Sequence, residues 1–389
     1  MRVNDVPFYI GLMSGTSLDG VDGVLVQYGG DKDLEGYDAT AVRTLASAHI
    51  EFSSQLRAEL MALQQCGNDE IHREALASNE LARCYAECVA HLLQVNNIDP
   101  MLIDAIGAHG QTVRHRPELG YTRQINNAAL LAELTGINVV ADFRSRDIAA
   151  GGQGAPLVPL FHQHIFGIEN HQRVVANIGG IGNISVLTPR RGGAEVVRAV
   201  AGFDTGPGNV LLDLWIHRHR GLAYDAGGAW AASGTLHLPL LQKLLSEPFF
   251  VRRPPKSTGR DLFNAAWLDH QLAQFSDLAS VDVQATLTEL TALTLSQSIL
   301  KYARDADAVY VCGGGAFNTF LLKRLEAALA RESLIIPVLS TAVLDIPPDQ
   351  VEALAFAWLA KRFMQHLPGN SPAATGASGE RICGALYPR

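Results

Sequence analysis

Four short glycine-containing segments are the strongest candidates for chemistry in this 389-residue sequence, and each follows an apolar run. Glycine permits positive φ and lets a ligand approach backbone N–H groups, which can surround phosphate oxygens. The first segment adds hydroxyl and carboxylate groups, and Asp19 and Asp22 suit Mg²⁺ beside a phosphate. The simplest alternative is that such turns only close hairpins. The candidate phosphate-binding residues of the first two segments are Gly15, Thr16, Ser17, Leu18, Asp19, Gly20, Val21, Asp22, Gly179, Gly180 and Asn183.

The third segment carries an aspartate, Asp204, at the end of an apolar run and just before Gly206, Gly208 and Asn209. In α/β proteins, catalytic groups lie where a strand ends and a helix begins. Asp204 could instead cap the following helix, but Asn209 or Thr205 is available for that task. We therefore favour a catalytic role for Asp204.

The fourth segment runs from a strand into Gly313, Gly314 and Gly315 and reaches Asn318 before a helix. Bare backbone of this kind can lie against a flat ring such as adenine. Close packing of the helix on the strand would need the same glycines. Both explanations stay open at this point.

Polar side chains follow two further predicted strands. His109 and Gln111 follow one strand, and Asp142 and Arg144 follow another. Donors and acceptors of these types suit a sugar, and arginine suits a carboxylate. Glu352, early in the last long predicted helix, is structural by default and a weak candidate metal ligand.

The elements that must position these residues follow a repeated order. The pattern predicts strand, turn and strand over residues 8–28, and again over 173–187. Helices are expected over about 282–303, over 319–330, and from the prolines at 347–348 to about 366, and the tail is expected to dock back through 382–387. We therefore expect a duplicated α/β fold with a cleft between two domains, residues 1–155 plus 345–389 and residues 156–344. The cluster of glycine and proline at 151–159 is the expected hinge or boundary.

Composition excludes several classes of protein. The chain is 48% hydrophobic and 18% charged with a net charge of −8, which excludes disorder and argues against nucleic acid or anionic membranes as partners. Its 5 cysteines are scattered, and we find neither a signal peptide nor a membrane-spanning run, so a cytoplasmic protein with reduced thiols is expected. The sequence lacks GxxxxGK[ST], GxGxxG, HExxH and GxSxG, which removes the main support for P-loop, Rossmann, zincin and α/β-hydrolase functions.

Taken together, these motifs closely resemble the anhydro-N-acetylmuramic acid kinase family. The likeness extends from about Tyr9 to Tyr387, with the motifs in the order of the family. The segments that carry it are Met13–Asp22, His109–Thr112, Ala141–Arg144, Ala149–Pro159, Asn177–Asn183, Phe203–Asn209 and Cys312–Asn318.

This resemblance implies the two-domain fold of actin, sugar kinases and Hsp70, with ATP and Mg²⁺ as cofactors. It assigns the turns at 15–22 and 179–183 to phosphates and 313–318 to the nucleoside. It places His109, Gln111, Asp142 and Arg144 near the sugar, and it implies a homodimer. The family opens 1,6-anhydro-N-acetylmuramic acid with water and phosphorylates O6 during recycling of peptidoglycan, which gives Asp204 the role of the base that activates water.

Two other functions stay open from the residues alone. One is a kinase of an ordinary sugar hydroxyl, in which Asp204 would deprotonate the substrate. The other is a nucleotide-operated switch or a sugar-binding regulator, although the chain has no acidic peptide-binding extension and no helix-turn-helix.

Overall fold

The computed structural model describes residues 7–15, 17–28, 42–189 and 201–389, so Thr16 lies outside the described residues. These residues form two compact units. The first contains the described residues up to 166 and those from 350 onward, and the second contains those between 167 and 349. The cluster at 151–159 therefore lies inside the first unit.

A six-stranded sheet forms the centre of the first unit, in the order β13-β7-β4-β1-β2-β3. Strand β1 pairs antiparallel with β2 and parallel with β4, while β2 pairs antiparallel with β3 and β4 parallel with β7. The strands are β1 (Phe8–Met13), β2 (Gly20–Tyr28), β3 (Val42–Glu51), β4 (Ile103–Ala108), β7 (Val139–Ala141) and β13 (Ala385–Tyr387).

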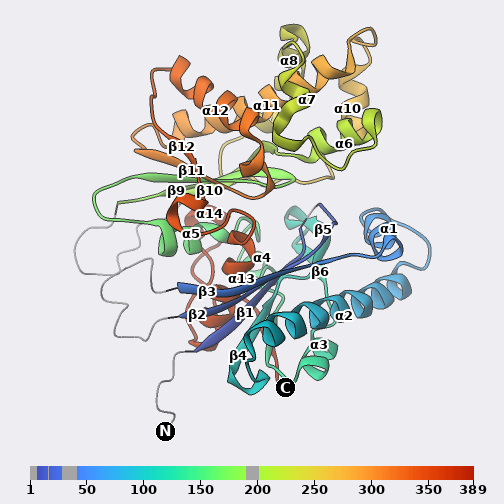
Figure 1. Cartoon of the computed structure of the whole chain (residues 1–389), viewed down its shortest axis with the longest axis vertical. Coiled ribbons are helices and arrows are strands. Elements are labelled where there is room, and N and C mark those ends of the chain that lie inside the picture. Colours follow the sequence, from blue (N-terminus) through green and yellow to red (C-terminus); the bar gives the residue numbers. More distant parts are fainter. Residues whose placement is uncertain (1–6, 16, 29–41, 190–200) are drawn as a thin grey trace. The chain divides into compact units, whose positions relative to one another are not determined.

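Long helices cover the two faces of this sheet (Figure 1). Because side chains alternate along a strand, Leu12 faces α2 (Glu70–Asn96) and joins its core cluster. Gly11 and Gly107 are paired in register on the other face, where the absence of a β-carbon lets α13 (Val351–Met364) pack on the backbone. The remaining helices are α1 (Ser54–Ala62), α3 (Ala128–Thr135), α4 (Ser145–Ala149), α5 (Val158–Phe166) and α14 (Pro372–Thr375).

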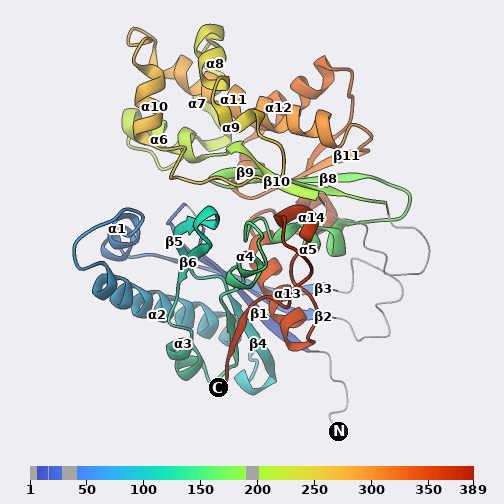
Figure 2. The same cartoon turned by 180° about the vertical axis from the view of Figure 1, so that it is seen from behind.

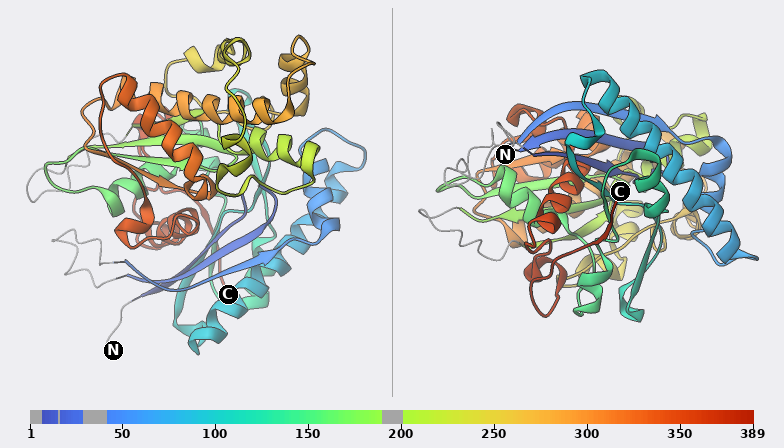
Figure 3. Two further views of the ribbon diagram at one scale, coloured as in Figure 1. Left: turned by 45° about the horizontal axis from the view of Figure 1, so that its top comes forward. Right: turned by 90° about the horizontal axis from the view of Figure 1, so that it is seen from below.

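The second unit repeats the same topology in a five-stranded sheet, in the order β10-β9-β8-β11-β12. Strand β8 pairs antiparallel with β9 and parallel with β11, as β1 does with β2 and β4. The strands are β8 (Arg173–Ile178), β9 (Ile181–Leu187), β10 (Ala201–Pro207), β11 (Ala308–Cys312) and β12 (Val338–Ser340). Helix α11 (Ser280–Tyr302) lies across this sheet (Figure 3), and α12 (Thr319–Arg331) completes the apolar core.

Short helices gather at one end of the second unit (Figure 2) and form a second apolar cluster with α11. They are α6 (Val210–Arg220), α7 (Ala229–Ala232), α8 (Leu238–Leu245), α9 (Pro248–Val251) and α10 (Ala265–Leu272). Short 3₁₀ helices cover Pro100–Leu102, Pro117–Leu119, Ala226–Gly228, Gly314–Phe317 and Thr341–Leu344.

The predicted α/β fold is confirmed, and the repeated topology of the two sheets agrees with the actin-like class. One prediction is wrong: the last long helix begins at Val351, because Pro348 lies in the preceding turn, where its carbonyl accepts a bond from Gly313 N at 2.8 Å. The tail docks as predicted, since β13 pairs with β7. None of the described helices is long and apolar enough to cross a membrane.

Candidate active site

In the second unit, the turn between β8 and β9 is held by backbone hydrogen bonds. Gly180 O accepts bonds from the N–H groups of Gly208 (2.9 Å) and Val210 (3.1 Å), and Gly179 O accepts one from Asn209 (2.8 Å). A β-carbon at Gly208 would overlap Gly179 O, so only glycine fits there. Two of the predicted segments, 179–183 and 206–209, therefore meet at one edge of the sheet.

Asp204 lies in β10, opposite Asn183 of β9, and is 7% exposed. Its carboxylate Oδ2 accepts a hydrogen bond from Thr258 N at 2.9 Å, and its own N–H donates to Lys256 O at 3.2 Å. These two bonds fix the acid beside the segment 256–258. A carboxylate held by a backbone N–H is oriented to accept a proton from a reactant.

Neither Asn209 nor Thr205, the two residues available to cap α6, does so with its side chain. Asn209 stands at the cap position but makes no side-chain cap bond; its amide Nδ2 donates to Ile178 O at 3.1 Å. Thr205 Oγ1 donates to Gly182 O at 3.0 Å. Asp204 is not the cap either, because its carboxylate is directed to Thr258.

Lys256 is a buried cation close to Asp204 that the sequence analysis did not select. Its Nζ lies 3.3 Å from Phe249 O, 3.4 Å from Phe250 O and 4.4 Å from the centre of the Phe249 ring. Burial lowers the pKa of Lys256 to about 8, and the Asp204 carboxylate opposes this shift. No pattern of spacing could have found this pair, because only the fold brings the two segments together.

The three glycines after β11 have different roles. A β-carbon at Gly313, which has φ 77°, or at Gly315 would collide with Asn177 or Ile178 at the end of β8. Gly314 is exposed, and a β-carbon there would meet only Asn209 Nδ2 at 3.7 Å. Asn318 caps α12 by accepting from Leu321 N at 3.0 Å. Packing therefore explains Gly313 and Gly315, and Gly314 offers an open backbone.

Two side-chain amide oxygens at this edge have no hydrogen-bond partner in the part of the chain that the structure describes. Asn177 and Asn183 are paired across β8 and β9, and their Oδ1 atoms are buried without a hydrogen-bond partner among the described residues. Buried polar atoms are normally satisfied, so this pair favours a bound ligand or water beside the turn. Asn177 was not among the predicted site residues, although a polar residue in an apolar strand was a signal.

The turn of the first unit is partly exposed and is shaped by side chains. Asp19 Oδ1 accepts bonds from Ser17 Oγ (2.6 Å) and Gly20 N (3.0 Å). Leu18 has φ 56° and is fully buried, as is Val21, so these two can reach a ligand only through the main chain. A β-carbon at Gly15 would make only ordinary contacts within its own turn, with Ser17 Oγ at 3.6 Å and Ser17 N at 4.0 Å.

The candidate metal ligands are dispersed. Asp22 Oδ1 lies 2.7 Å from His49 Nδ1, and Glu352 lies in the first turn of α13. Among the described residues, no three His, Cys, Asp or Glu side chains come together as a metal site. Any Mg²⁺ here would depend on water and phosphate oxygens for most of its ligands.

Three of the four predicted sugar residues, His109, Gln111 and Arg144, are connected to the first turn by hydrogen bonds. Gln111 Nε2 donates to Gly15 O at 3.1 Å. His109 is buried and accepts at Nε2 from Arg144 Nε (3.1 Å) and Nη2 (3.0 Å). Burial, and next the Arg144 charge, hold the pKa of His109 well below its usual value, so the ring is neutral. Asp142 is exposed and accepts from Ser145 Oγ at 2.5 Å.

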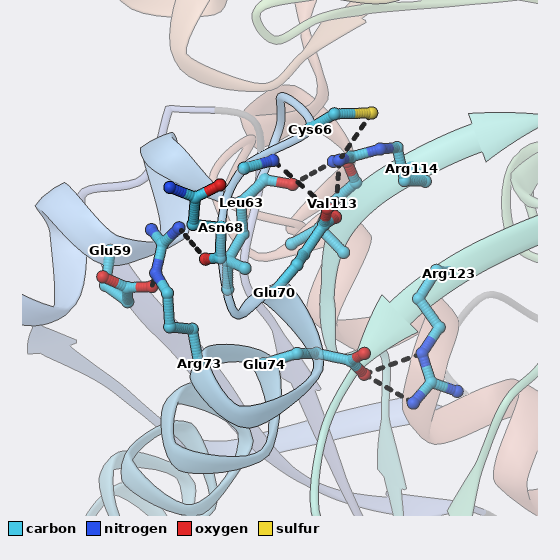
Figure 4. Close-up of polar contacts among 11 residues, drawn as sticks. Glu59, Leu63, Cys66, Asn68, Glu70, Arg73, Glu74, Val113, Arg114 and Arg123 are labelled. Carbon is cyan, nitrogen blue, oxygen red and sulfur yellow. Dashed lines mark hydrogen bonds and ion pairs between the residues drawn. The ribbon is translucent and has the colours of Figure 1, made fainter.

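A hairpin that the sequence analysis did not predict carries Gln111. It consists of β5 (Gln111–Arg116) and β6 (Tyr121–Ile125), and ion pairs join it to α2 (Figure 4). Arg114 Nη2 lies 2.6 Å from Glu70 Oε1, and Arg123 Nη2 lies 2.5 Å from Glu74 Oε1. Arg114 also donates to Leu63 O in the segment that follows α1, so this hairpin is attached to the α1–α2 region.

Comparisons with known proteins identify the family of this chain. The family model of anhydro-N-acetylmuramic acid kinase matches residues 7–389. Anhydro-N-acetylmuramic acid kinase of Burkholderia thailandensis is 57% identical over 382 residues, covering 98% of this chain and 97% of that protein. The same enzyme of Paraburkholderia xenovorans is 56% identical and covers 98% of both chains.

Among solved structures, an activator of 2-hydroxyisocaproyl-CoA dehydratase from Clostridium difficile, with bound ADPNP, has 11% identity and a TM-score of 0.46, covering 92% of this chain and 98% of that chain. The assignment to a family depends on the relatives that share more than half of their residues with this sequence. On that ground, the chain belongs to the anhydro-N-acetylmuramic acid kinase family.

Proposed function

We propose that this chain is an ATP-dependent kinase that opens 1,6-anhydro-N-acetylmuramic acid with water and phosphorylates O6. The products are N-acetylmuramic acid 6-phosphate and ADP. The observation that carries the proposal is the buried Asp204 carboxylate, held by Thr258 N–H at 2.9 Å beside the glycine turns, in a chain of this family. The reaction belongs to peptidoglycan recycling and amino-sugar catabolism.

Asp204 is the proposed catalytic base. It accepts a proton from water as the water oxygen attacks the anomeric carbon, and the bond from that carbon to O6 breaks. An inverting glycosidase would protonate the departing oxygen with a second acid, whereas here O6 takes the γ-phosphoryl group of ATP. The bond from the γ-phosphorus to the β,γ-bridging oxygen breaks, ADP leaves, and Asp204 returns its proton to solvent.

The two turns are proposed to bind the phosphates of ATP. Backbone N–H groups of Gly15–Asp22 and Gly179–Asn183 provide donors around a loose transition state, for which positioning matters most. Gly206, Gly208 and Asn209 support the second turn, and Gly313–Gly315 with Asn318 are proposed to meet the nucleoside, chiefly through the open backbone of Gly314.

Mg²⁺ is proposed as the second cofactor. The Asp19 carboxylate fits it, because Oδ1 is oriented by two bonds from its own turn and carboxylate oxygens are preferred ligands. Asp22 and Glu352 are the other proposed contacts. When bound, the ion would neutralise phosphate charge.

His109, Gln111, Asp142 and Arg144 are the proposed sugar residues. Arg144 is proposed to pair with the lactyl carboxylate, and the bonds from Arg144 to the neutral His109 ring orient its guanidinium. We also propose that the enzyme is a homodimer, as the family resemblance implies, and that it acts in the cytoplasm, as its scattered cysteines predict.

Replacement of the base tests the central proposal. Asp204→Asn is expected to keep binding of the sugar and of an ATP analogue, measured by calorimetry, and to lose about 10²- to 10⁴-fold in turnover. Asp225→Asn is the matched control, because Asp225 is 8% exposed and its carboxylate also accepts backbone N–H bonds, from Trp230 and Ala231. That control is expected to lower stability and to keep turnover. Near wild-type turnover in Asp204→Asn would contradict the assignment.

Labelled water separates hydrolytic opening from the phosphorylation of an ordinary hydroxyl. Turnover in ¹⁸O-water is expected to place the label on the anomeric oxygen of the product, as read by mass spectrometry. Product without label would exclude the attack of water.

A further inference from the structure

The buried hydroxyl of Tyr85 lies where two candidate loops of the first unit meet. Tyr85 is fully buried on the inner face of α2, among the apolar residues of the core. Burial raises the pKa of Tyr85 well above its usual value, so the phenol keeps its proton. A buried tyrosine hydroxyl needs polar partners, and neighbouring apolar side chains of α2 cannot supply them.

Three hydrogen bonds around this hydroxyl form a closed ring. Gly110 N donates to Tyr85 Oη at 3.1 Å, and Ser14 Oγ donates to Gly110 O at 3.1 Å. Because that bond uses the only proton of Ser14 Oγ, the 2.9 Å bond between the two hydroxyls runs from Tyr85 to Ser14. Each group therefore donates once and accepts once, an arrangement in which hydrogen bonds strengthen one another.

The ring joins the two loops to which the proposed function gives different ligands. Ser14 precedes Gly15 in the proposed phosphate turn, and Gly110 lies between His109 and Gln111 of the proposed sugar loop. Two more bonds cross the same junction: His109 Nδ1 with Ser14 O at 3.3 Å and Gln111 Nε2 to Gly15 O at 3.1 Å. Because of these bonds, a shift of either loop would also displace the other.

The connection continues away from the turn. The His109 ring receives the Arg144 guanidinium at Nε2, which leaves Nδ1 to carry the proton that points to Ser14 O. Arg144 Nη1 donates to Gly154 O at 2.9 Å. The phosphate turn, the sugar loop and the glycine loop at 151–154 are thus linked by consecutive hydrogen bonds.

We propose that Tyr85 is a positioning residue that couples ATP binding to sugar binding, by fixing Ser14 and Gly110 relative to each other. This inference rests on the proposed function, because it needs phosphates at one loop and the sugar at the other. Tyr85 touches neither ligand; it acts through the two loops. When one ligand binds, it orders both loops, and the second ligand then binds with higher affinity. By linkage, each ligand raises the affinity of the other by the same factor.

Tyr85→Phe is the test, because it removes one oxygen and keeps the ring that packs in the core. The readout is the dissociation constant of a non-hydrolysable ATP analogue, measured with and without 1,6-anhydro-N-acetylmuramic acid. In the wild type, the sugar is expected to lower the dissociation constant of the analogue by about 5-fold or more. In the variant this factor is expected to fall to about 1. The kcat/KM for the sugar is expected to fall about 10- to 100-fold, as for a misplaced site.

Tyr28→Phe is the matched control. Tyr28 is 1% exposed in the same unit, and its hydroxyl has no hydrogen-bond partner among the described residues. This variant is expected to keep both the coupling factor and kcat/KM. Ser14→Ala breaks the ring from its other side and is expected to reproduce the loss of coupling, so the proposal stays testable if Tyr85→Phe folds poorly.

The possible results separate the two proposals. If Tyr85→Phe and Ser14→Ala lower only the melting temperature and keep the wild-type coupling factor, the role of Tyr85 is structural and the inference is overturned. If the wild-type chain binds neither ligand, the proposed function itself fails.

Discussion

The turns that follow β1 and β8 occupy equivalent positions in the two sheets, yet they are held differently. In the second unit, the carbonyls of Gly179 and Gly180 accept backbone N–H bonds from 208–210, and the contact excludes a β-carbon at Gly208. In the first unit, a backbone bond from Phe52 N to Asp19 O (3.0 Å) is joined by a side-chain network of Ser14, Gln111 and Tyr85. The close contact at Gly208 accepts only glycine, whereas a side-chain network can be altered by replacing one group at a time.

Gly208→Ala is expected to have the largest effect, because its β-carbon would displace the carbonyl of Gly179. We expect a loss of about 1–3 kcal/mol in the free energy of unfolding and at least about 100-fold in kcat/KM for ATP. Gln111→Ala, which removes one bond to the first turn, is the comparison and is expected to lose only about 1 kcal/mol of stability. Equal losses of stability, measured by urea denaturation, would contradict the contrast between the two turns.

Gly179→Ala and Gly15→Ala test the turns as ligand sites. A β-carbon would lie 3.8 Å from Ile181 O in the first case and 3.6 Å from Ser17 Oγ in the second, so both variants should fold normally. If phosphates approach these glycines, each variant is expected to raise the KM for ATP about 10-fold, equivalent to about 1.4 kcal/mol. Unchanged KM values with unchanged melting temperatures would place the phosphates elsewhere.

As the pH falls, we expect the folding stability of the first unit to decrease before that of the second. In the folded first unit, burial lowers the pKa of His115 to about 4 and that of His162 to about 3, and His109 is shifted in the same direction. Below about pH 6.5 the unfolded chain binds protons that the folded unit does not, so stability falls as pH falls, by up to about 1.4 kcal/mol per pH unit for each group.

Hydrogen exchange followed by mass spectrometry at pH 7 and pH 5.5 would measure this difference between the units. His115→Gln is expected to reduce the acid sensitivity of the first unit. His91→Gln, at an exposed position on α2, serves as the control and should leave it unchanged. An equal acid response in both units would argue against the buried histidines as its cause.

Sequence alone predicts the parts of this molecule that depend on local pattern. The apolar runs of β1, β2, β8 and β9 are strongly patterned, so both hairpins are confirmed. The β5–β6 hairpin was missed because Gln111–Arg116 is largely polar, and its position depends on ion pairs to Glu70 and Glu74, far away in the chain.

Residues of the candidate site were likewise predicted where a local pattern marks them, and missed where contacts between distant segments define them. Glycine turns and Asp204 are visible in the sequence, because residue type and spacing carry their signal. The partners that hold them, Thr258 for Asp204 and Tyr85 for the first turn, are recognisable only when distant segments meet. Two of the glycines at 313–315 also proved to be needed for packing.

The interrupted first unit has a consequence for the order of folding. Its sheet is completed by β13, and one face is covered by α13, both of which are synthesised after residue 349. The second unit is continuous in sequence and is fully synthesised by then. On the ribosome, we therefore expect the second unit to complete its fold first, whereas the face of the first sheet that α13 covers stays uncovered until residues 350–389 have been synthesised.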